Sequence, residues 1–418
     1  MIKIQWMILL EQIHSKILIE KELLMNDLNS FKTPYYLIDY EALDTNYNKM
    51  KRAFSTYWKG EICLGYSFKT NHLPWMLNYM KSKGAYAEVV SNDEYHLAEL
   101  VGYKPTEIIF NGPIKTGEIF KKALVSGSVV NVDSFTELNQ IIIMNSFKKI
   151  KVGLRLNFDL ESECPSESAM GTEPSRFGFC LENGDFEKAL NICKESEVFV
   201  CGIHMHQSTK TRSLSVFKSL AKKAANCIRQ FNMKDTIEYI DIGGGFFGGT
   251  DYLTKPTYDD YARAISKYLS NEVNMNKTKL IIEPGASLVA TPISYITRVI
   301  DIKDVRNNRI VTVDGSILHI NPFLAKRQQS YQIYSQEVGD IYSDLQTICG
   351  STCMENDRLM KVNNLQELIE GDLIEFEKCG SYTMCYNSFF INMPPAVYLK
   401  QDGRFEKVRE SLSPKFLL

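Results

Sequence analysis

Residues Leu64–His72, LGYSFKTNH, end an apolar run with a lysine, Lys69. Short apolar runs of this kind recur about every 20 to 40 residues between residues 61 and 287, and helical patterns separate them. Near-continuous apolar strands that alternate with helices indicate parallel pairing with both faces of the sheet covered. Eight such units are typical of a closed (β/α)8 barrel. The eight runs are EICLGYSFK, AYAEVV, EIIFNG, SVVNVD, IKVGLRLN, VFVCGIHMH, IEYIDIGGG and KLIIEPG.

Every one of these runs ends in a polar residue or in glycine. Active sites of such barrels are built at the carboxyl ends of the strands, so Lys69 is expected to point into the mouth of the barrel. Ordinary strand-ending polar residues explain any one of the positions, but they explain eight together poorly. The strand-end residues are Lys69, Ser91, Asn111, Asp133, Asn157, His206, Gly243–Gly245 and Glu283.

The sequence pattern changes near residue 290. The later segments SYITRVIDIKDV, NRIVTVDGS, DLIEFEKCG and AVYLK show strand alternation, turn signals and little helix. We therefore expect an α/β chain with a (β/α)8 TIM barrel over residues 32–290 and a C-terminal β-sandwich or small β-barrel domain over residues 291–418. Residues 1–31 are expected to form a helical N-terminal extension, whose apolar patch WMILL is too short to span a bilayer.

The composition is that of an ordinary globular protein. The 418 residues are 44% hydrophobic and 23% charged, and the formal net charge of -2 includes no basic block. This balance argues against a nucleic-acid partner and against a membrane surface. The ten cysteines form no C-x-x-C pair and no spacing that closes a metal site. They predict reduced thiols in a cytoplasmic protein without a metal.

Lys69 and the glycine triplet suggest a specific chemistry. A lysine in a barrel mouth is useful when its neutral amine can form an imine. Three glycines at a strand end, Gly243, Gly244 and Gly245 in IDIGGGFFGG, leave backbone N–H groups that can surround a phosphate. The alternative for the triplet is a tight turn with close packing.

Two further strand ends complete the pattern. Glu283 precedes a Pro-Gly turn, and an ionised carboxylate beside a heteroaromatic nitrogen favours the protonated form of that nitrogen. His204 and His206 share one face of their strand, where a flat imidazole can stack on a cofactor ring. A hydrogen-bonded structural histidine is the alternative, which we prefer for His204. Lysine, phosphate cradle, carboxylate and stacking histidine together fit pyridoxal 5'-phosphate.

The same segments resemble the fold-type III pyridoxal-phosphate decarboxylases, the family of diaminopimelate, ornithine and arginine decarboxylases. The resemblance runs from about residue 32 to residue 400. YSFKTN is similar to the lysine segment of that family, and EVVSNDEYHLA is similar to its D-V-x-S-x-x-E-L segment. Seven more segments follow in family order: VGLRLN, SRFGF, GIHMHQS, DIGGGF, EPG, GSTCMENDRL and CGSYTMCYNSF.

The resemblance implies residue roles. Lys69 would hold the cofactor covalently and assist proton transfer, Glu283 would pair with the ring nitrogen, and His206 would stack on the ring. The glycine triplet and Tyr382 would bind the phosphate. Thr209, Gly285, Ala286 and Ser287 would also contact the cofactor, and Glu88 and Arg176 would line or brace the site. The substrate would meet Arg155, Asn321, Met354, Glu355 and Asp357.

The resemblance also implies a homodimer with shared active sites. In this family the segment that holds Cys353 and Asp357 is donated by the partner chain. The cysteine is the acid that would protonate the carbon from which carbon dioxide has left.

Four departures from the family pattern are visible. The family commonly has EPGR, whereas this chain has EPGAS, with Ala286 in place of the arginine and a hydroxyl at Ser287 as a partial substitute. The family's H-x-G-S is HQST here, so Ser208 and Thr209 replace glycine and serine.

The other two departures concern the substrate. Diaminopimelate decarboxylases usually carry R-P-x-L-Y, and this chain has N-P-F-L-A, Asn321–Ala325. Met354 follows Cys353 where an acid would receive a distal ammonium, and Glu355 comes one position later. A thioether cannot balance a desolvated ammonium. We therefore expect a decarboxylase of an amino acid or modified amino acid other than ornithine and meso-diaminopimelate.

Three alternatives stay open. The protein can be a diaminopimelate decarboxylase proper. It can be an amino-acid racemase, although alanine-racemase-like enzymes place an arginine at the pyridine nitrogen, where this chain has Glu283. It can also be an inactive regulator or a cofactor carrier, although Lys69 and Cys353 are both present and small carriers lack the second domain.

Overall fold

The computed structural model describes residues 27–144, 150–250, 252–326, 329–335, 342–386 and 388–418. The chain divides into two compact units, one over Ala42–Ala290 and one that joins Met1–Glu41 to Thr291–Leu418. The expected helix of residues 1–31 falls almost wholly outside the described residues. No helix in the described part of the chain is long and apolar enough to cross a membrane.

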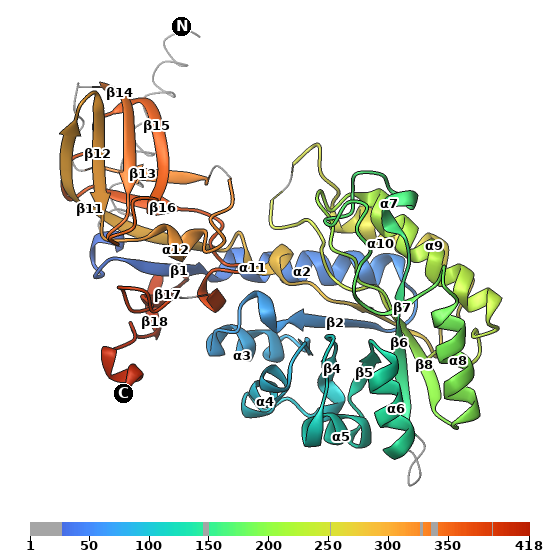
Figure 1. The fold of residues 1–418 in the computed structure, drawn as a ribbon. Coiled ribbons are helices and arrows are strands. Elements are labelled where there is room, and N and C mark those ends of the chain that lie inside the picture. Colours follow the sequence, from blue (N-terminus) through green and yellow to red (C-terminus); the bar gives the residue numbers. More distant parts are fainter. Residues whose placement is uncertain (1–26, 145–149, 251, 327–328, 336–341, 387) are drawn as a thin grey trace, which may run out of the picture. The chain divides into compact units, whose positions relative to one another are not determined.

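The unit Ala42–Ala290 is a closed barrel of parallel strands, as predicted (Figure 1). Each of the eight apolar runs of the sequence forms one of its strands, and pairing between β5 and β6 closes the cylinder. A short additional strand, β7 (Phe179–Cys180), pairs with β6. The barrel strands are β2 (Ile62–Ser67), β3 (Tyr86–Val89), β4 (Ile108–Phe110), β5 (Val129–Val132), β6 (Lys151–Asn157), β8 (Phe199–His204), β9 (Tyr239–Asp241) and β10 (Lys279–Ile282).

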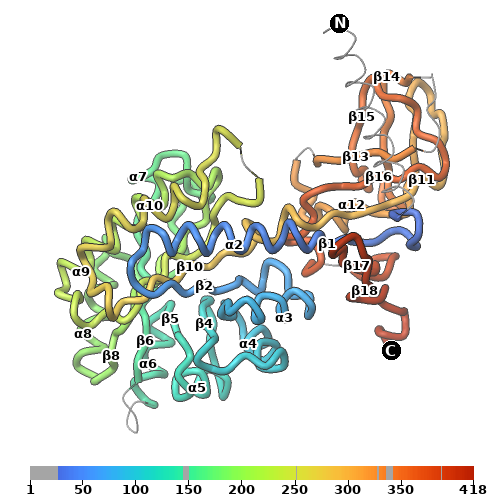
Figure 2. Tube along the Cα trace, turned by 180° about the vertical axis from the view of Figure 1, so that it is seen from behind, coloured from blue at the N-terminus to red at the C-terminus, as the bar shows by residue number. Residues whose placement is uncertain are grey.

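Helices connect these strands around the outside of the barrel. Their starts follow sequence signals: Ser91 caps α4 by accepting from Glu94 N–H, and Thr257 and Asp260 form a reciprocal capping box on α10. Helices α9 and α10 lie side by side in both views (Figures 1 and 2). The helices of this unit are α2 (Tyr40–Tyr57), α3 (Pro74–Ser82), α4 (Asn92–Leu100), α5 (Gly117–Ser126), α6 (Phe135–Met144), α7 (Leu160–Glu163), α8 (Asp185–Glu195), α9 (Leu214–Gln230), α10 (Tyr258–Leu269) and α11 (Ala286–Val289).

The barrel interior is filled by side chains, with Tyr239 inside it. A Cβ on Gly202 would lie 2.0 Å from the Tyr239 ring, and one on Gly153 would lie 2.1 Å from its hydroxyl. These two glycines are therefore needed so that β6 and β8 can pass close to the ring. Tyr239 therefore lies in the barrel interior, and active sites of such barrels are built at the carboxyl ends of the strands.

The second unit is a mixed sheet, which confirms the expected C-terminal β domain. Strands β15, β14, β12, β11, β1, β17 and β18 follow one another across it, and β16 joins β11 to β13. Its core contains Tyr35, Ile296, Leu373 and Tyr398. The strands are β1 (Tyr35–Asp39), β11 (Ile293–Val305), β12 (Asn308–Val313), β13 (Tyr331–Tyr334), β14 (Tyr342–Cys349), β15 (Arg358–Gln366), β16 (Leu373–Phe376), β17 (Ala396–Gln401) and β18 (Arg404–Arg409), and a short helix, α12 (Ile317–Ile320), follows β12.

Strand β1 belongs to this second sheet, although the sequence boundary placed residues from 32 onward in the barrel. It pairs antiparallel with β11 and parallel with β17. The apolar stretch YYLID predicts a strand equally well in either unit, and only the pairing partners, more than 250 residues away, decide between them.

Candidate active site

Lys69 lies in a short 3-10 turn, Phe68–Thr70, directly after β2. Its Nζ is 2.6 Å from Glu88 Oε2, and 37% of the lysine side chain is exposed whereas the Glu88 side chain is only 1% exposed. Glu88 also accepts a hydrogen bond from Ser67 Oγ. The lysine is thus anchored at its ammonium end by a buried carboxylate while it remains open to a ligand.

Asn111, at the end of β4, connects this ion pair to Glu283. Its Nδ2 donates to Glu88 Oε1 at 3.0 Å and to Glu283 Oε1 at 2.5 Å. Lys69, Glu88, Asn111 and Glu283 therefore form one continuous polar chain across the strand ends. The structure brings the two residues that the sequence assigned to the aldehyde and to the ring nitrogen into this single network.

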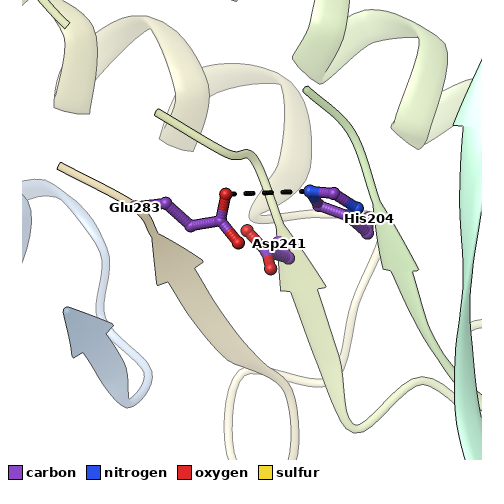
Figure 3. Close-up of side chains that lie close together, drawn as sticks. All are labelled: His204, Asp241 and Glu283. Atoms are coloured by element: carbon purple, nitrogen blue, oxygen red, sulfur yellow. Dashed lines mark ion pairs between the residues drawn. The ribbon is translucent and has the colours of Figure 1, made fainter. Parts of the chain in front are cut away.

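Glu283 lies among two other ionisable side chains on neighbouring strand ends (Figure 3). His204 Nε2 is 3.7 Å from Glu283 Oε2, and Asp241 lies between their strands in the close-up. Burial lowers the pKa of His204, and burial together with the Glu283 charge raises the pKa of Asp241 well above its usual range. Burial alone would raise the pKa of Glu283, but His204, Asp241 and Lys69 outweigh it and hold that pKa below its usual range.

The cluster consequently carries its negative charge on Glu283. Two buried carboxylates this close cannot both ionise cheaply, so Asp241 keeps the proton. An ionised, buried Glu283 is what a protonated heteroaromatic nitrogen needs as a partner. The sequence did not single out Asp241 as a site residue, although a carboxylate inside the buried run YIDI is itself a signal of a polar network.

These three residues are also a donor set that a metal ion can use. Their ligand atoms lie within 4.8 Å of one another. However, Glu283 Oε1 accepts from Asn111, and the two Asp241 oxygens accept from Asn131 Nδ2 and Gly243 N–H. Three of the four carboxylate oxygens are therefore already bonded, and the absence of a metal site stays our prediction.

Both the side chain and the backbone carbonyl of His206 are hydrogen-bonded. Its Nδ1 accepts the N–H of Gly244 at 3.2 Å, and its carbonyl oxygen accepts from Arg155 Nη2 at 3.2 Å. Burial, and then the charge of Arg155, lowers the pKa of His206 to about 3. The imidazole is therefore neutral at physiological pH and oriented, as a ring that stacks on a cofactor must be.

Arg155 is itself fixed by a buried ion pair. Its Nη1 lies 3.0 Å from Asp133 Oδ1, with both side chains less than one-tenth exposed. Its guanidinium lies 4.4 Å from the centre of the Phe177 ring, and that of Arg176 lies 4.2 Å from the same ring. Arg155 therefore braces His206, and the expectation that it binds substrate stays a prediction.

The glycine loop has less room for an anion than the sequence suggests. Gly243 N–H donates to Asp241 and Gly244 N–H to His206, so both already have partners inside the barrel. A Cβ on Gly244 would lie 2.2 Å from Glu283 O, whereas one on Gly245, with φ +87°, would meet nothing within 4 Å. The open position over Gly245 is thus the one available to a phosphate.

The segment after Glu283 offers another polar group. Gly285 lets the chain pass Thr70, since a Cβ there would lie 2.1 Å from Thr70 Oγ1. Ala286 begins α11 without any charge to offer. The Ser287 hydroxyl is buried and has no hydrogen-bond partner among the described residues. A buried hydroxyl without a partner is unusual and is satisfied when a ligand group binds beside it.

The other predicted residue of this unit is Thr209, which forms an isolated bridge with Ser168. The neighbouring Ser208 accepts the N–H of Ala169 through its carbonyl oxygen. Both contacts fix the loop after β8. A cofactor contact from Thr209 stays a prediction.

The remaining predicted residues lie in the second unit. Cys353 is exposed and Met354 is half-buried. The buried Asp357 carboxylate accepts from Thr352 N–H and Oγ1 and from Ile317 N–H, so it fixes the loop that carries the cysteine. Tyr382 is half-buried with φ +54°.

The barrel residues fit pyridoxal 5'-phosphate. The chain provides an accessible amine at Lys69, an ionised carboxylate at Glu283 linked to it through Asn111, an open glycine position at Gly245 and an unbonded buried hydroxyl at Ser287. Lys69 matches the aldehyde of the cofactor, Glu283 matches its ring nitrogen, and the position at Gly245 and the Ser287 hydroxyl match its phosphate.

Comparisons with known proteins agree with this fit. Residues 41–290 match the family model described as pyridoxal-dependent decarboxylase, pyridoxal binding domain. The probable chloroplastic diaminopimelate decarboxylase of Oryza sativa subsp. japonica is 29% identical over 396 residues, which cover 91% of this chain and 78% of that protein. Diaminopimelate decarboxylase of Helicobacter pylori is 27% identical over 389 residues, covering 91% and 93%.

A solved structure extends the likeness to both units. The crystal structure of diaminopimelate decarboxylase from M. jannaschii in complex with L-lysine superposes with a TM-score of 0.82 at 25% identity, over 94% of this chain and 95% of that one. The chain therefore belongs to the fold-type III pyridoxal-dependent decarboxylases, amino-acid decarboxylases that use pyridoxal 5'-phosphate, and is similar to the diaminopimelate decarboxylases among them.

Proposed function

We propose that the protein releases carbon dioxide from an amino acid whose distal end differs from those of meso-diaminopimelate and ornithine. One observation carries the proposal. The amide of Asn321, where the family resemblance leads us to expect an arginine, donates to Ala325 O at 2.8 Å and accepts from Ala325 N–H at 3.2 Å. The side chain is thereby bonded within its own loop and has no charge with which to grip a distal carboxylate.

The segment after Cys353 supports the same proposal. Met354 offers no charge to a distal ammonium. The Glu355 side chain is fully exposed, and its Oε2 lies 3.7 Å from Arg358 Nη2. The distal group of the substrate is then uncharged or larger, as in a modified or conjugated amino acid.

The residues of the site have defined tasks in this reaction. When bound, pyridoxal 5'-phosphate supplies the electron sink for the bond that breaks. Lys69 would hold the aldehyde of this group and yield that place to the substrate amine, and Glu283 would face the ring nitrogen and keep it protonated. The α-carboxylate leaves as carbon dioxide, and Cys353 or Lys69 gives the α-carbon a proton.

We also propose that the protein acts as a homodimer in the cytoplasm. The second unit exposes apolar side chains that favour burial against a partner. The ten cysteines, all within the described part of the chain, are free thiols, which favours a reducing compartment. The exposed apolar residues include Phe323, Leu324, Phe390 and Ile391.

Diaminopimelate decarboxylase proper is the second candidate. The Oryza and Helicobacter relatives favour it, as does the M. jannaschii structure with L-lysine. The racemase and inactive-regulator alternatives are weaker, because Glu283 is an acid, and Lys69 and Cys353 are both in place.

Carbon dioxide release by the purified, cofactor-loaded protein separates the candidates. The substrates are meso-diaminopimelate, ornithine, arginine and a set of amino acids with neutral or conjugated distal groups. We expect kcat/KM of at least about 10⁴ M⁻¹s⁻¹ for a member of the last set and far lower values for the first two. A value in that range for meso-diaminopimelate or ornithine overturns the proposal.

A further inference from the structure

Asn111 occupies a position that no role in the reaction yet explains. It is 3% exposed at the carboxyl end of β4, where its single NH2 group donates to two different buried carboxylates, Glu88 and Glu283. Two neighbouring carboxylates repel each other and lose solvation when buried. An amide that donates to both offsets this cost without adding a charge.

The orientation of this amide is fixed by the groups behind it. Asn111 Oδ1 accepts from Asn131 Nδ2 at 2.8 Å, and Asn131 Oδ1 in turn accepts from the Tyr239 hydroxyl at 2.8 Å. Ionised carboxylates can only accept, so the reversed amide would place its oxygen against both of them. The chain from Tyr239 through Asn131 therefore points the donors of Asn111 at Glu88 and Glu283.

The two bridged carboxylates would serve different parts of the cofactor. Glu88 holds the ammonium of Lys69 at 2.6 Å, and Glu283 would face the ring nitrogen. Asn111 is the direct hydrogen-bonded link between them. Other ionisable groups that face Glu283 are His204 at the end of β8, His206 after it, Asp241 and Tyr239 on β9, and Cys63 on β2.

We propose that Asn111 is a positioning residue that keeps Glu283 ionised and aimed at the ring nitrogen while it holds Glu88 in place for Lys69. This inference depends on the family's cofactor and is independent of the substrate. Removal of the amide leaves two buried carboxylates side by side, and the cheaper state is then one in which Glu283 takes up a proton or turns away. The ring nitrogen loses its anionic partner in either case.

Two variants of purified full-length protein test this role by cofactor titration. Asn111→Leu keeps the branched shape of the side chain and removes both donors. Asn111→Asp keeps the shape but can donate only when protonated, so its defect is expected to grow with pH. Thr278→Val is the matched control, because Thr278 is 1% exposed, its hydroxyl donates to Ile237 O, and it lies just before the amino end of β10, opposite Glu283.

The expected result is that Asn111→Leu binds pyridoxal 5'-phosphate about 10-fold or more weakly and shifts the pH dependence of the bound-cofactor absorbance. For Asn111→Asp, the loss of affinity relative to wild type increases as pH rises from about 6 to about 8. Thr278→Val lowers thermal stability but leaves the cofactor titration unchanged.

Three results overturn the inference. The first is a wild-type cofactor affinity and absorbance profile in Asn111→Leu, and the second is an equal loss of affinity in Thr278→Val. The third is a loss of affinity in Asn111→Asp that does not change with pH. If Asn111→Leu does not fold, the pH dependence of Asn111→Asp decides alone. Failure of the wild type to bind the cofactor would instead count against the assignment of the site.

Discussion

Lys69 Nζ lies 2.6 Å from Glu88 Oε2, so the amine that is assigned to the cofactor is paired with a carboxylate that water barely reaches. A charge-assisted hydrogen bond to a buried acid is stronger than one at the surface. The pair holds the lysine at the mouth of the barrel, and Ser67 and Asn111 hold the acid.

Glu88→Gln removes the charge of this pair but keeps its shape. We expect kcat to fall about 10-fold or more, because Lys69 loses its ionic partner while the amide oxygen still accepts from Ser67. Steady-state kinetics and the rate of cofactor uptake by the apoprotein measure the effect. Glu118→Gln, which breaks an exposed pair with Lys121, is the control and is expected to match wild type. Equal kinetics in Glu88→Gln and wild type would contradict this role.

Glu283→Gln tests the charge at the ring nitrogen. A neutral amide no longer favours the protonated nitrogen, so we expect kcat to fall by at least about 100-fold while the cofactor stays bound through Lys69. Steady-state kinetics measure kcat, and the absorbance of the bound cofactor shows whether the cofactor stays bound. Glu238→Gln, in an exposed pair with Lys151 at the amino end of β9, is expected to change neither. Retention of wild-type kcat would exclude Glu283 from the reaction.

His206 makes the apoprotein sensitive to acid. Its pKa is about 3 in the folded chain against an ordinary value of 6.5, so between those values the unfolded chain binds more protons. Stability therefore rises with pH across this window and is lost as pH falls through it. The free energy of unfolding, measured with urea at several pH values, is expected to rise less steeply with pH for His206→Asn than for wild type. His96→Asn, at an exposed position on α4, should keep the wild-type slope, and identical slopes in all three would refute the prediction.

A shared active site predicts complementation between two inactive variants. Lys69→Ala and Cys353→Ala are each expected to lack activity as homodimers. If the cysteine acts in the partner's site, mixed dimers contain one intact site, and an equimolar mixture after subunit exchange regains about a quarter of wild-type activity. The size of the particles and the activity of the mixture are measured on the same sample. Exchanged dimers with no recovered activity would show that each chain uses its own Cys353.

Most of the barrel could be predicted from the sequence. All eight strands lie within the apolar runs, because strands buried on both faces must be apolar throughout. Lys69, Glu283 and His206 could be found in the same way, since each belongs to the polar or glycine end of a run. The boundary at β1 could not, because a short apolar strand does not encode which distant strand it pairs with.

The hydrogen-bond partners within the site could not be predicted either. Asp241 and Asn131 lie within a run, before its polar or glycine end, and their role depends on which side of the barrel wall they face. The glycine triplet was expected to give three N–H groups to a phosphate, yet two of them bond Asp241 and His206. Such pairings depend on the register between strands, which local sequence patterns do not fix.

The covalent attachment of the cofactor tests the central claim most directly. Purified protein is reduced with borohydride, digested, and its peptides are analysed by mass spectrometry. The account predicts a single pyridoxyl-phosphate modification, close to one per chain, on the peptide that contains Lys69, and none in Lys69→Ala. Modification of a different lysine, or an unmodified wild type that still releases carbon dioxide from its substrate, would contradict it.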